Sequence, residues 1–222
     1  MKKLSVILFF LSLIMISISC GSKSFNEASS TNEASSTNEV AIGNQVWMTE
    51  NLNVDKFQNG DPIPEAKTDE EWMRAGEKEQ PAWCYYENDP FNGTKYGKLY
   101  NWYAVKDPRG LAPKGFYIPS DSEWTILTDY LGGTTSGTKM KSNKGWNQNG
   151  NGTNSSGFSG LPGGSRSSTG TFYFVGEFGY WWSFSEYATA DATYRTLGYR
   201  FAYLSNTYNK KAHGHSVRCL KD

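Results

Sequence analysis

The sequence has no surplus of charge of either sign, because 22 lysine and arginine residues are matched by 22 aspartate and glutamate residues. It also has no long basic block, which argues against a nucleic-acid partner, since phosphate binding needs clustered Lys and Arg. Apart from one segment near the N-terminus there is no long apolar run, and the mean hydropathy of −0.61 excludes a protein with several membrane spans. Cysteine and histidine are scarce, at three and two copies.

Glycine and aromatic residues are abundant instead, with 23 Gly, 14 Tyr, 12 Phe and 8 Trp among 222 residues. Many glycines and aromatics with few aliphatic residues predict a loop-rich domain with short strands and a core of Trp and Tyr side chains, rather than a helical bundle. The length fits one domain with a sizeable core.

The first residues have the pattern of an export signal. Two lysines precede an apolar run that is followed directly by Cys20 and is shorter than the roughly 20 residues that cross a bilayer as a helix. Residues 17–20, SISC, resemble the lipobox of bacterial lipoproteins, with Ser17 where a Leu is usual. The pattern predicts a lipoprotein signal peptide at residues 1–19, lipidation of Cys20 and a membrane anchor. The alternative is an ordinary signal peptide followed by an incidental cysteine.

Residues 26–37 consist of the six-residue unit NEASST, present twice. This tract has no aromatic and no β-branched aliphatic residue, so it buries too little apolar surface to offset the entropy of ordering. We interpret residues 20–39 as the lipidated cysteine followed by a flexible linker. The folded domain is then residues 40–222, and the mature chain becomes slightly acidic once the two lysines of the signal peptide are removed.

Two helices have clear start signals. Residues 68–71, TDEE, can form a capping box in which the Thr side chain caps the first turn and the Glu reaches back, and Gly76 is expected to end the helix. Residues 120–123, SDSE, repeat the box, and the glycines at 132–133 supply the stop. The apolar residues of the second helix have helical spacing, at Trp124, Leu127 and Leu131.

The remaining signals indicate strands. The Gly-Asn pair at residues 43–44, between two short apolar stretches, predicts a two-residue hairpin turn. Short aromatic segments separated by glycine or polar turns predict a late group of strands at Thr171–Val175, Tyr180–Phe184, Tyr194–Leu204 and Ser216–Leu220. Helices early in the chain and strands late make the expected fold class α+β.

Two cysteines remain for the folded domain if Cys20 carries the lipid. An even pair in an exported protein predicts a disulfide between Cys84 and Cys219. This bond would close a loop of roughly 135 residues, which the chain-entropy model values at about 4–5 kcal/mol. The alternative is a pair of free buried thiols.

Seven motifs, in order along the chain, carry a resemblance to a known family. They are IGNQVWMTENLNV at 42–54, WCYYENDP at 83–90, YGKLYNWYAV at 96–105, GFYIPSDSEWTILTDYLGG at 115–133, GFSGLPGGSR at 157–166, GYWWSFSEY at 179–187 and SVRCLKD at 216–222. Together they resemble the Fibrobacter succinogenes major paralogous domain, which is common in lipoproteins and surface proteins of Bacteroidetes and Fibrobacteres. The resemblance covers about residues 41–222.

That family is similar to the C-type-lectin-like fold, which is shared with the formylglycine-generating enzymes. The resemblance implies two short helices, a twisted antiparallel β-sheet with long loops, and chain ends that are brought together. Formylglycine-type oxidation needs a reactive Cys, usually a pair near the C-terminus. Because Cys219 is the only cysteine in the last third of the chain, we predict no catalytic residues.

No cofactor is expected, with a structural calcium as the one exception. Calcium-dependent lectins use Glu-Pro-Asn or Gln-Pro-Asp together with Trp-Asn-Asp, and none of these strings occurs. Loop oxygens are present at Asn59–Asp61 and Asn88–Pro90, although turn chemistry explains both segments. No Cys or carboxylate pattern completes a metal site around His213 and His215, so we interpret these residues as a polar turn.

The large aromatic residues divide into core and candidate surface. Four are expected in the core: Trp72, Trp83, Trp124 and Trp182. Strand alternation sends Trp181 to the opposite face from Trp182. Tyr, Trp and Arg dominate binding hot spots, and the sequence predicts an exposed ligand-binding platform made of Arg166, Tyr173, Trp181 and Tyr187.

The sequence favours a non-enzymatic, membrane-anchored module of the cell envelope whose late strands and loops bind a glycan or protein ligand. It predicts an outer-membrane lipoprotein, with the periplasmic and the surface-exposed side both open. Two alternatives are a structural component of a surface assembly and an oxidoreductase of the formylglycine-generating type.

Overall fold

The computed structural model describes residues 38–222. The predicted signal peptide, the lipidation site Cys20 and nearly all of the predicted linker lie outside these residues. The β-strands are β1 (Glu39–Ile42), β2 (Gln45–Met48), β3 (Trp83–Cys84), β4 (Leu99–Tyr100), β5 (Phe116–Tyr117), β6 (Gly163–Arg166), β7 (Phe172–Val175), β8 (Phe178–Glu186), β9 (Asp191–Gly198), β10 (Leu204–Lys210) and β11 (Leu220–Lys221).

Five α-helices are present within residues 38–222. They are α1 (Asp69–Glu77), α2 (Pro90–Tyr96), α3 (Trp102–Val105), α4 (Asp121–Tyr130) and α5 (Ser136–Met140). In this part of the chain no helix is long and apolar enough to cross a bilayer.

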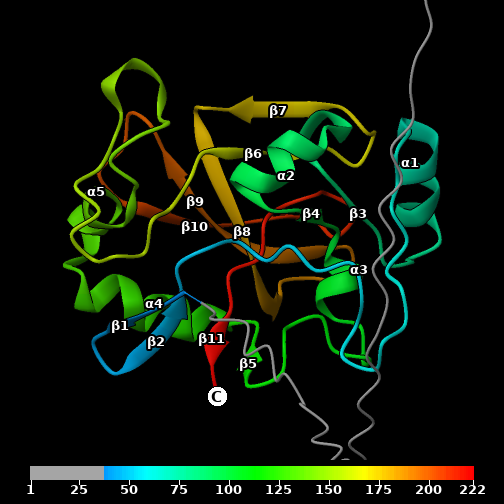
Figure 1. The fold of residues 1–222 in the computed structure, drawn as a ribbon, viewed down its shortest axis with the longest axis horizontal. Coiled ribbons are helices and arrows are strands. Elements are labelled where there is room, and N and C mark those ends of the chain that lie inside the picture. The colour runs from blue at the N-terminus through cyan, green and yellow to red at the C-terminus, as the bar shows by residue number, and fades with distance from the viewer. Residues whose placement is uncertain (1–37) are drawn as a thin grey trace, which may run out of the picture. The chain divides into compact units, whose positions relative to one another are not determined.

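The strands form three sheets. Five strands in the order β10-β9-β8-β6-β7 make the largest sheet, β1-β2-β11-β5 make a second, and β3 pairs with β4. Neighbouring strands are antiparallel except β6 and β8, which run parallel where Gly164 lies beside Gly179. In Figure 1 the long strand β8 crosses the middle of the domain, between α4 and α5 on one side and α1 on the other. This mixture of helices and sheets confirms the α+β class.

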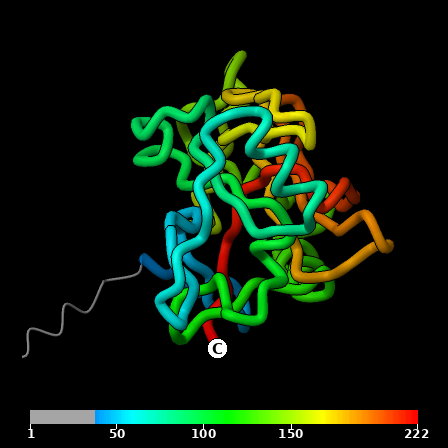
Figure 2. Tube along the Cα trace, turned by 90° about the vertical axis from the view of Figure 1, so that its right-hand side faces the viewer, coloured from blue at the N-terminus to red at the C-terminus, as the bar shows by residue number. Residues whose placement is uncertain are grey.

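The two ends of the folded domain meet in the second sheet. β1 and β2 form the predicted hairpin, with Ile42 opposite Gln45 and Gly43 at a φ of 64°, where a residue without a side chain is favoured. The last strand, β11, pairs with β2 through Leu220 and Trp47. Figure 2 shows this C-terminal strand, in red, beside the blue N-terminal hairpin.

Both predicted capping boxes are present. The Thr68 hydroxyl accepts from the Glu71 backbone N–H, and the Glu71 carboxylate accepts from the Thr68 N–H at 3.1 Å. Ser120 and Glu123 make the same exchange at the start of α4. These helices therefore start where local chemistry predicts, although α1 continues to Glu77, one residue past the expected stop.

Two helices were predicted, and the described residues contain five. The three that were not predicted, α2, α3 and α5, are only four to seven residues long. Of these, α2 had a readable signal: Asp89 caps it by accepting from the Phe91 N–H at 2.9 Å, and Pro90 occupies its first position. The sequence alone predicts a turn at Asn88–Pro90. Short helices have no apolar periodicity to set them apart from such a turn.

The predicted single strand from Tyr194 to Leu204 is wrong. β9 ends at Gly198, and the chain then turns back to form β10, which pairs antiparallel with β9. The turn starts with a hydrogen bond from the Phe201 N–H to the Gly198 carbonyl at 3.1 Å. The alternation of aromatic and small residues at 197–203 includes this turn, so the pattern alone did not reveal that the strand ends at Gly198.

β8 has a hydrophobic core on each of its faces. The first core contains Trp182 with Trp83, Tyr100, Trp102 and other buried residues. The second core contains Trp181 with Trp47, Trp124, Phe158 and residues of α4 and β9. A third, smaller cluster lies under α1 around Trp72. The four tryptophans expected in the core, at positions 72, 83, 124 and 182, are all buried.

Cys84 and Cys219 are free, buried thiols, so the structure does not contain the predicted disulfide. Cys219 belongs to the first core, together with Trp83. Cys84 belongs to the cluster under α1, because consecutive residues of a strand point to opposite faces and Cys84 directly follows Trp83. Burial raises the pKa of both thiols to about 12, which makes them poor nucleophiles at neutral pH.

We predict that reductant leaves the melting temperature of the protein unchanged. A bridge closing so long a loop would contribute about 4–5 kcal/mol, and its reduction would lower the melting temperature by well over 5 °C. The measurement is differential scanning calorimetry with and without a phosphine reductant, with alkylation under native and denaturing conditions as a control. Cys84 and Cys219 should be alkylated only after unfolding, without prior reduction. A large drop in the melting temperature would contradict the structure.

Candidate functional site

Exposed aromatic side chains gather on the late strands of the domain. Ten large hydrophobic residues are exposed within residues 38–222, and seven of them come from the segment between β7 and β10. These seven are Tyr173, Phe174, Phe184, Tyr187, Phe201, Tyr203 and Tyr208. The two tryptophans of this segment, Trp181 and Trp182, are buried in the core, whereas these seven smaller rings are exposed to solvent. Exposed apolar patches of this kind mark interaction sites.

Five rings form a continuous row, which we call the aromatic strip: Tyr173, Phe174, Phe178, Tyr180 and Tyr194. Successive ring centroids along this row are 5.6, 5.5, 5.9 and 5.8 Å apart. Tyr173 and Phe174 are 43% and 49% exposed, whereas the other three are half-buried. The strip therefore runs from an open rim on β7 across β8 to β9, three strands that are labelled in Figure 1.

Phe174 holds its place in the strip through an unusual backbone. Its φ is 68°, in the left-handed region that bulky residues avoid, at a cost of about 1–2 kcal/mol. The facing residue of β6, Gly164, also has a positive φ, of 67°. Tyr173 and Phe174 are consecutive, yet their rings are in contact rather than on opposite faces of the strand. Strain of this kind often accompanies a functional side chain.

The inner end of the strip reaches a buried histidine. His215 is fully buried, and its ring lies 5.1 Å from Tyr180, 4.7 Å from Tyr194 and 4.3 Å from Trp182. Neither ring nitrogen has a hydrogen-bond partner among the described residues. Burial lowers the pKa of His215 well below its usual value, and the neighbouring His213 lowers it further. The imidazole is therefore neutral. His215 is part of the core, whereas His213 lies half-buried at the bend before it, as the predicted turn requires.

The two tyrosines of the inner strip keep their phenolic protons. Burial raises the pKa of Tyr180, with smaller contributions from Tyr194 and Glu177. Burial also raises the pKa of Tyr194. Their hydroxyl groups are therefore neutral at physiological pH, and each can donate one hydrogen bond and accept others.

A second pair of exposed rings lies at the other end of β8. Tyr187 and Tyr208 stack with centroids 3.9 Å apart and an interplanar angle of 4°, and both are more than half exposed. Tyr187 follows the last residue of β8, whereas the strip crosses its first residues. Tyr208 lies opposite Thr193, the neighbour of Tyr194 in β9, but consecutive strand residues point to opposite faces, so the pair and the strip lie on different faces of the sheet.

Of the four residues predicted for the binding platform, the structure exposes two and places them apart. Tyr173 belongs to the aromatic strip and Tyr187 to the second pair. Arg166 and Trp181 are both fully buried, so the prediction that they are exposed is wrong.

Arg166 is a structural clamp rather than part of a surface. Its Nε donates to the Gly170 carbonyl at 2.8 Å, its Nη1 to the Ala66 carbonyl at 2.8 Å, and its Nη2 to the Asp69 carboxylate at 3.1 Å. The guanidinium also lies over the Trp72 ring, with 4.9 Å to the centroid. It thereby joins the β6–β7 hairpin to the start of α1.

Trp181 is buried because β8 is covered on both faces. Its ring lies 5.8 Å from Phe158 in the second core, and its Nε1 donates to the Asn51 side-chain oxygen at 2.8 Å. Alternation correctly places it opposite Trp182. The inference that one of these faces is open was wrong, because alternation does not reveal whether a second layer covers a strand.

Four members of the strip were not predicted from the sequence: Phe174, Phe178, Tyr180 and Tyr194. A signal was available in the density of aromatic residues around Gly176, where the β7–β8 hairpin turns. The positive φ of Phe174 had no such signal, because left-handed backbone favours glycine or asparagine.

The loop oxygens considered for calcium have other partners. The Asp61 carboxylate accepts from Asn59 at 3.0 Å and from Arg109 at 3.3 Å, and both contacts lower the pKa of Asp61. Asp89 caps α2. Among residues 38–222, no group of three or more His, Cys, Asp or Glu side chains is arranged to hold a metal ion.

Comparison with known proteins gives one finding. The family model described as the Fibrobacter succinogenes major domain matches residues 40–221. No curated protein and no solved structure matches the chain. The match covers nearly all of the described domain, including every strand from β2 to β11.

Proposed function

Because the chain belongs to the Fibrobacter succinogenes major domain family, we propose that its domain is a lectin-like, carbohydrate-binding module held at the cell envelope by a lipid on Cys20. The observation that carries the proposal is the aromatic strip. The pairing of β2 with β11 supports a lectin-like arrangement, since it brings the chain ends together. The predicted signal peptide and linker support the anchor.

The strip has the chemistry that a sugar requires. The C–H face of a sugar ring packs on an aromatic ring, and its hydroxyls need neutral hydrogen-bond donors and acceptors. Tyr173 and Phe174 supply exposed rings at the open end, and the Tyr180 and Tyr194 hydroxyls supply polar groups further in. Tyrosine-rich surfaces also bind at a low cost in side-chain entropy. A glycan therefore fits the strip better than an apolar protein surface does.

A non-enzymatic role is part of the proposal. Formylglycine-type oxidation depends on an accessible thiolate. Cys84 and Cys219 are both buried, and burial raises the pKa of each to about 12. Neither thiol has the accessibility or the acidity of a nucleophile.

We predict that Phe174→Ala and Tyr173→Ala each weaken glycan binding by about 10- to 100-fold, as the loss of a central aromatic contact does. Phe174→Gly is a useful companion, since glycine accepts a positive φ and the ring alone is removed. The measurement is a glycan array with the full-length chain, followed by titration calorimetry with the best ligand. Phe91→Ala is the matched control, because Phe91 is 85% exposed on α2 and lies outside the strip.

The proposal fails if the array yields no saturable ligand, or if the control variant weakens binding as much as the strip variants. An array without ligands, together with crosslinking in cells that recovers only self-contacts, would favour a structural component of a surface assembly.

A further inference from the structure

A polar cleft of about 370 Å³ lies between the segment 49–53, the second half of α2 and the loops at 142–144 and 154–161. It shares no residue with the aromatic strip. Amide, hydroxyl and ammonium groups dominate its lining, with Leu161 and Tyr96 as the main apolar contributors. A cleft of this size admits a small polar molecule, and its chemistry follows from the charges around it.

Two asparagines that line the cleft, Asn51 and Asn53, are each bound to a buried cation. The Asn51 side-chain oxygen accepts from Arg218, at 2.7 Å from Nη2 and 3.2 Å from Nε. The Asn53 side-chain oxygen accepts from Lys98 Nζ at 3.1 Å. Asn51 also donates to the Tyr96 carbonyl at 2.8 Å, which fixes its orientation. Both side chains are therefore held in place, and each is bonded to a buried positive charge.

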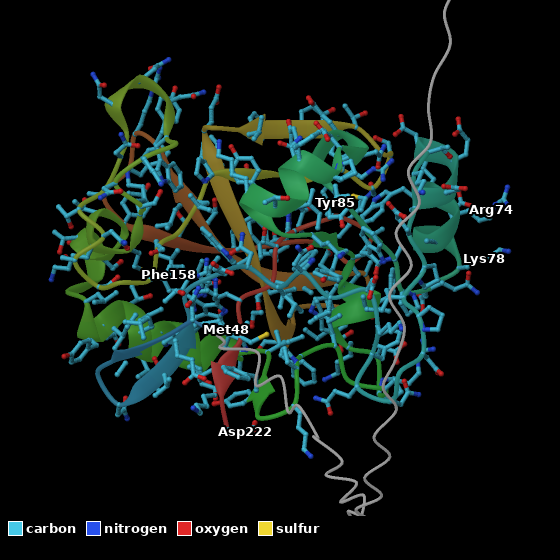
Figure 3. All side chains as sticks on the ribbon, viewed as in Figure 1. Met48, Arg74, Lys78, Tyr85, Phe158 and Asp222 are labelled. Carbon is cyan, nitrogen blue, oxygen red and sulfur yellow. The ribbon has the colours of Figure 1, made fainter. Side chains whose placement is uncertain are left out.

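Within the described domain, neither cation forms a direct ion pair with a carboxylate, although the charge of Glu50 acts on Arg218 and raises its pKa. Arg218 is fully buried, and its other acceptors are the backbone carbonyls of Met48 and Phe158, which are both labelled in Figure 3. Lys98 is 4% exposed and otherwise donates to the Asn53 carbonyl. No ion pair found within residues 38–222 includes Arg218 or Lys98. Burial lowers the pKa of Arg218 to about 9, so the guanidinium keeps its charge at neutral pH.

The rim adds two more positive charges. Lys95 and Lys144 line the cleft, are exposed, and take part in none of the ion pairs of the described domain. Glu50 is the single carboxylate in the lining, and it accepts a hydrogen bond from Asn38 at 3.2 Å. Positive charges that are fixed in a low-dielectric wall concentrate their potential in the adjacent cleft. An anion is therefore attracted to it.

Neutral hydrogen-bonding groups on the rim are also free. The side chains of Thr94 and Asn143 line the cleft, are exposed, and make no hydrogen bond within the described residues. A hydroxyl and a primary amide together offer donors and acceptors to the hydroxyl groups of a ligand. A fully ionised inorganic anion would use only the donors of these two groups and leave their acceptor oxygens without a partner.

We propose that this cleft binds a sugar residue that bears a carboxylate, a uronic acid, with the carboxylate near the lysines and the hydroxyls on Thr94 and Asn143. The inference goes beyond the aromatic strip and does not depend on it. It gives the domain a second, charge-selective site for carbohydrate.

The test is titration of the full-length chain with glucuronate, followed by calorimetry and by NMR of the Asn side-chain amides. We expect saturable binding with a Kd of about 1 mM, typical of one sugar residue, and shifts of the Asn51 and Asn53 amides. The double variant Lys95→Gln/Lys144→Gln should weaken binding about tenfold, and Thr94→Val should weaken it as well. Lys114→Gln is the matched control, because Lys114 is exposed and lies outside the cleft.

Three further titrations distinguish a uronic-acid site from a neutral-sugar site, from a phosphate site and from the aromatic strip. Glucose should bind at least about tenfold more weakly than glucuronate, and so should inorganic phosphate. Phe174→Ala should leave glucuronate binding unchanged, which distinguishes this cleft from the strip. Absence of saturable binding, equal binding of glucose or phosphate, or an unchanged Kd in the double lysine variant would each overturn the proposal.

Discussion

Replacing Asn51 by leucine is expected to lower the free energy of unfolding by about 3–5 kcal/mol, the range seen when a buried charge loses its partner. The Asn51 oxygen receives three donors: the Trp181 indole at 2.8 Å and two nitrogens of Arg218. Leucine would leave these buried donors without an acceptor. Urea unfolding followed by tryptophan fluorescence measures the loss.

Asn51→Asp is the matched control for this prediction. It keeps an oxygen for Trp181 and Arg218 and adds a negative charge beside the buried guanidinium. It loses only the two donor contacts of the amide nitrogen, to the Tyr96 carbonyl and the Ser216 hydroxyl. The expected loss is about 1–2 kcal/mol. If the leucine and aspartate variants were equally stable, Arg218 would not depend on Asn51.

Stability is expected to fall as the pH drops through about 6.5, the usual pKa of histidine in an unfolded chain. Burial lowers the pKa of both His213 and His215 in the folded state. Below pH 6.5 the unfolded chain therefore binds protons that the folded chain does not. The loss reaches about 1.4 kcal/mol per pH unit for each histidine, until the pH falls to the folded-state pKa.

This window is separate from that of the carboxylates. Asp61, Glu71, Asp107 and Glu123 also have lowered pKa values, but their contributions are lost only below about pH 4.5. Urea unfolding between pH 5 and 7.5 thus isolates the histidines. His215→Phe should roughly halve the slope, leaving the contribution of His213, while preserving the aromatic packing against Tyr180 and Trp182. An unchanged slope in this variant would show that His215 is not the group that titrates.

The parts of the fold that depend on neighbours in sequence were predictable. Thr68 with Glu71, and Ser120 with Glu123, are three residues apart, and both helices begin where these pairs predict. The hairpin at Gly43 is equally local, because the left-handed turn needs a residue without a side chain.

Features that depend on distant neighbours were not predictable. Arg166 is buried because it binds Ala66 and Asp69, which are about a hundred residues earlier in the chain. Trp181 is buried because Phe158 and α4 cover the second face of β8. Arginine is mostly exposed in folded proteins and is fully buried only when it is paired, so its partners, and not the composition, decide its place.

The candidate site was predictable in its region but not in its members. The late aromatic segment was expected to carry the binding surface, and Tyr173 lies in the strip. Phe174 joins it only through a backbone conformation that no sequence pattern indicates. The polar cleft escaped detection because its cations, Lys98 and Arg218, come from segments 120 residues apart and meet only in the folded chain.

The meeting of the first and last strands has a consequence for how such a domain is built into larger proteins. Glu39 and Lys221 form an ion pair with a distance of 2.7 Å between the ammonium and carboxylate groups. β1 and β11 are separated only by β2, so the entry and exit points lie roughly 10 Å apart. A host protein could therefore carry the domain as an insertion in a surface loop, because the two ends of that loop would need to be only about 10 Å apart. Tandem copies could equally be joined by short connectors, each copy closing on itself.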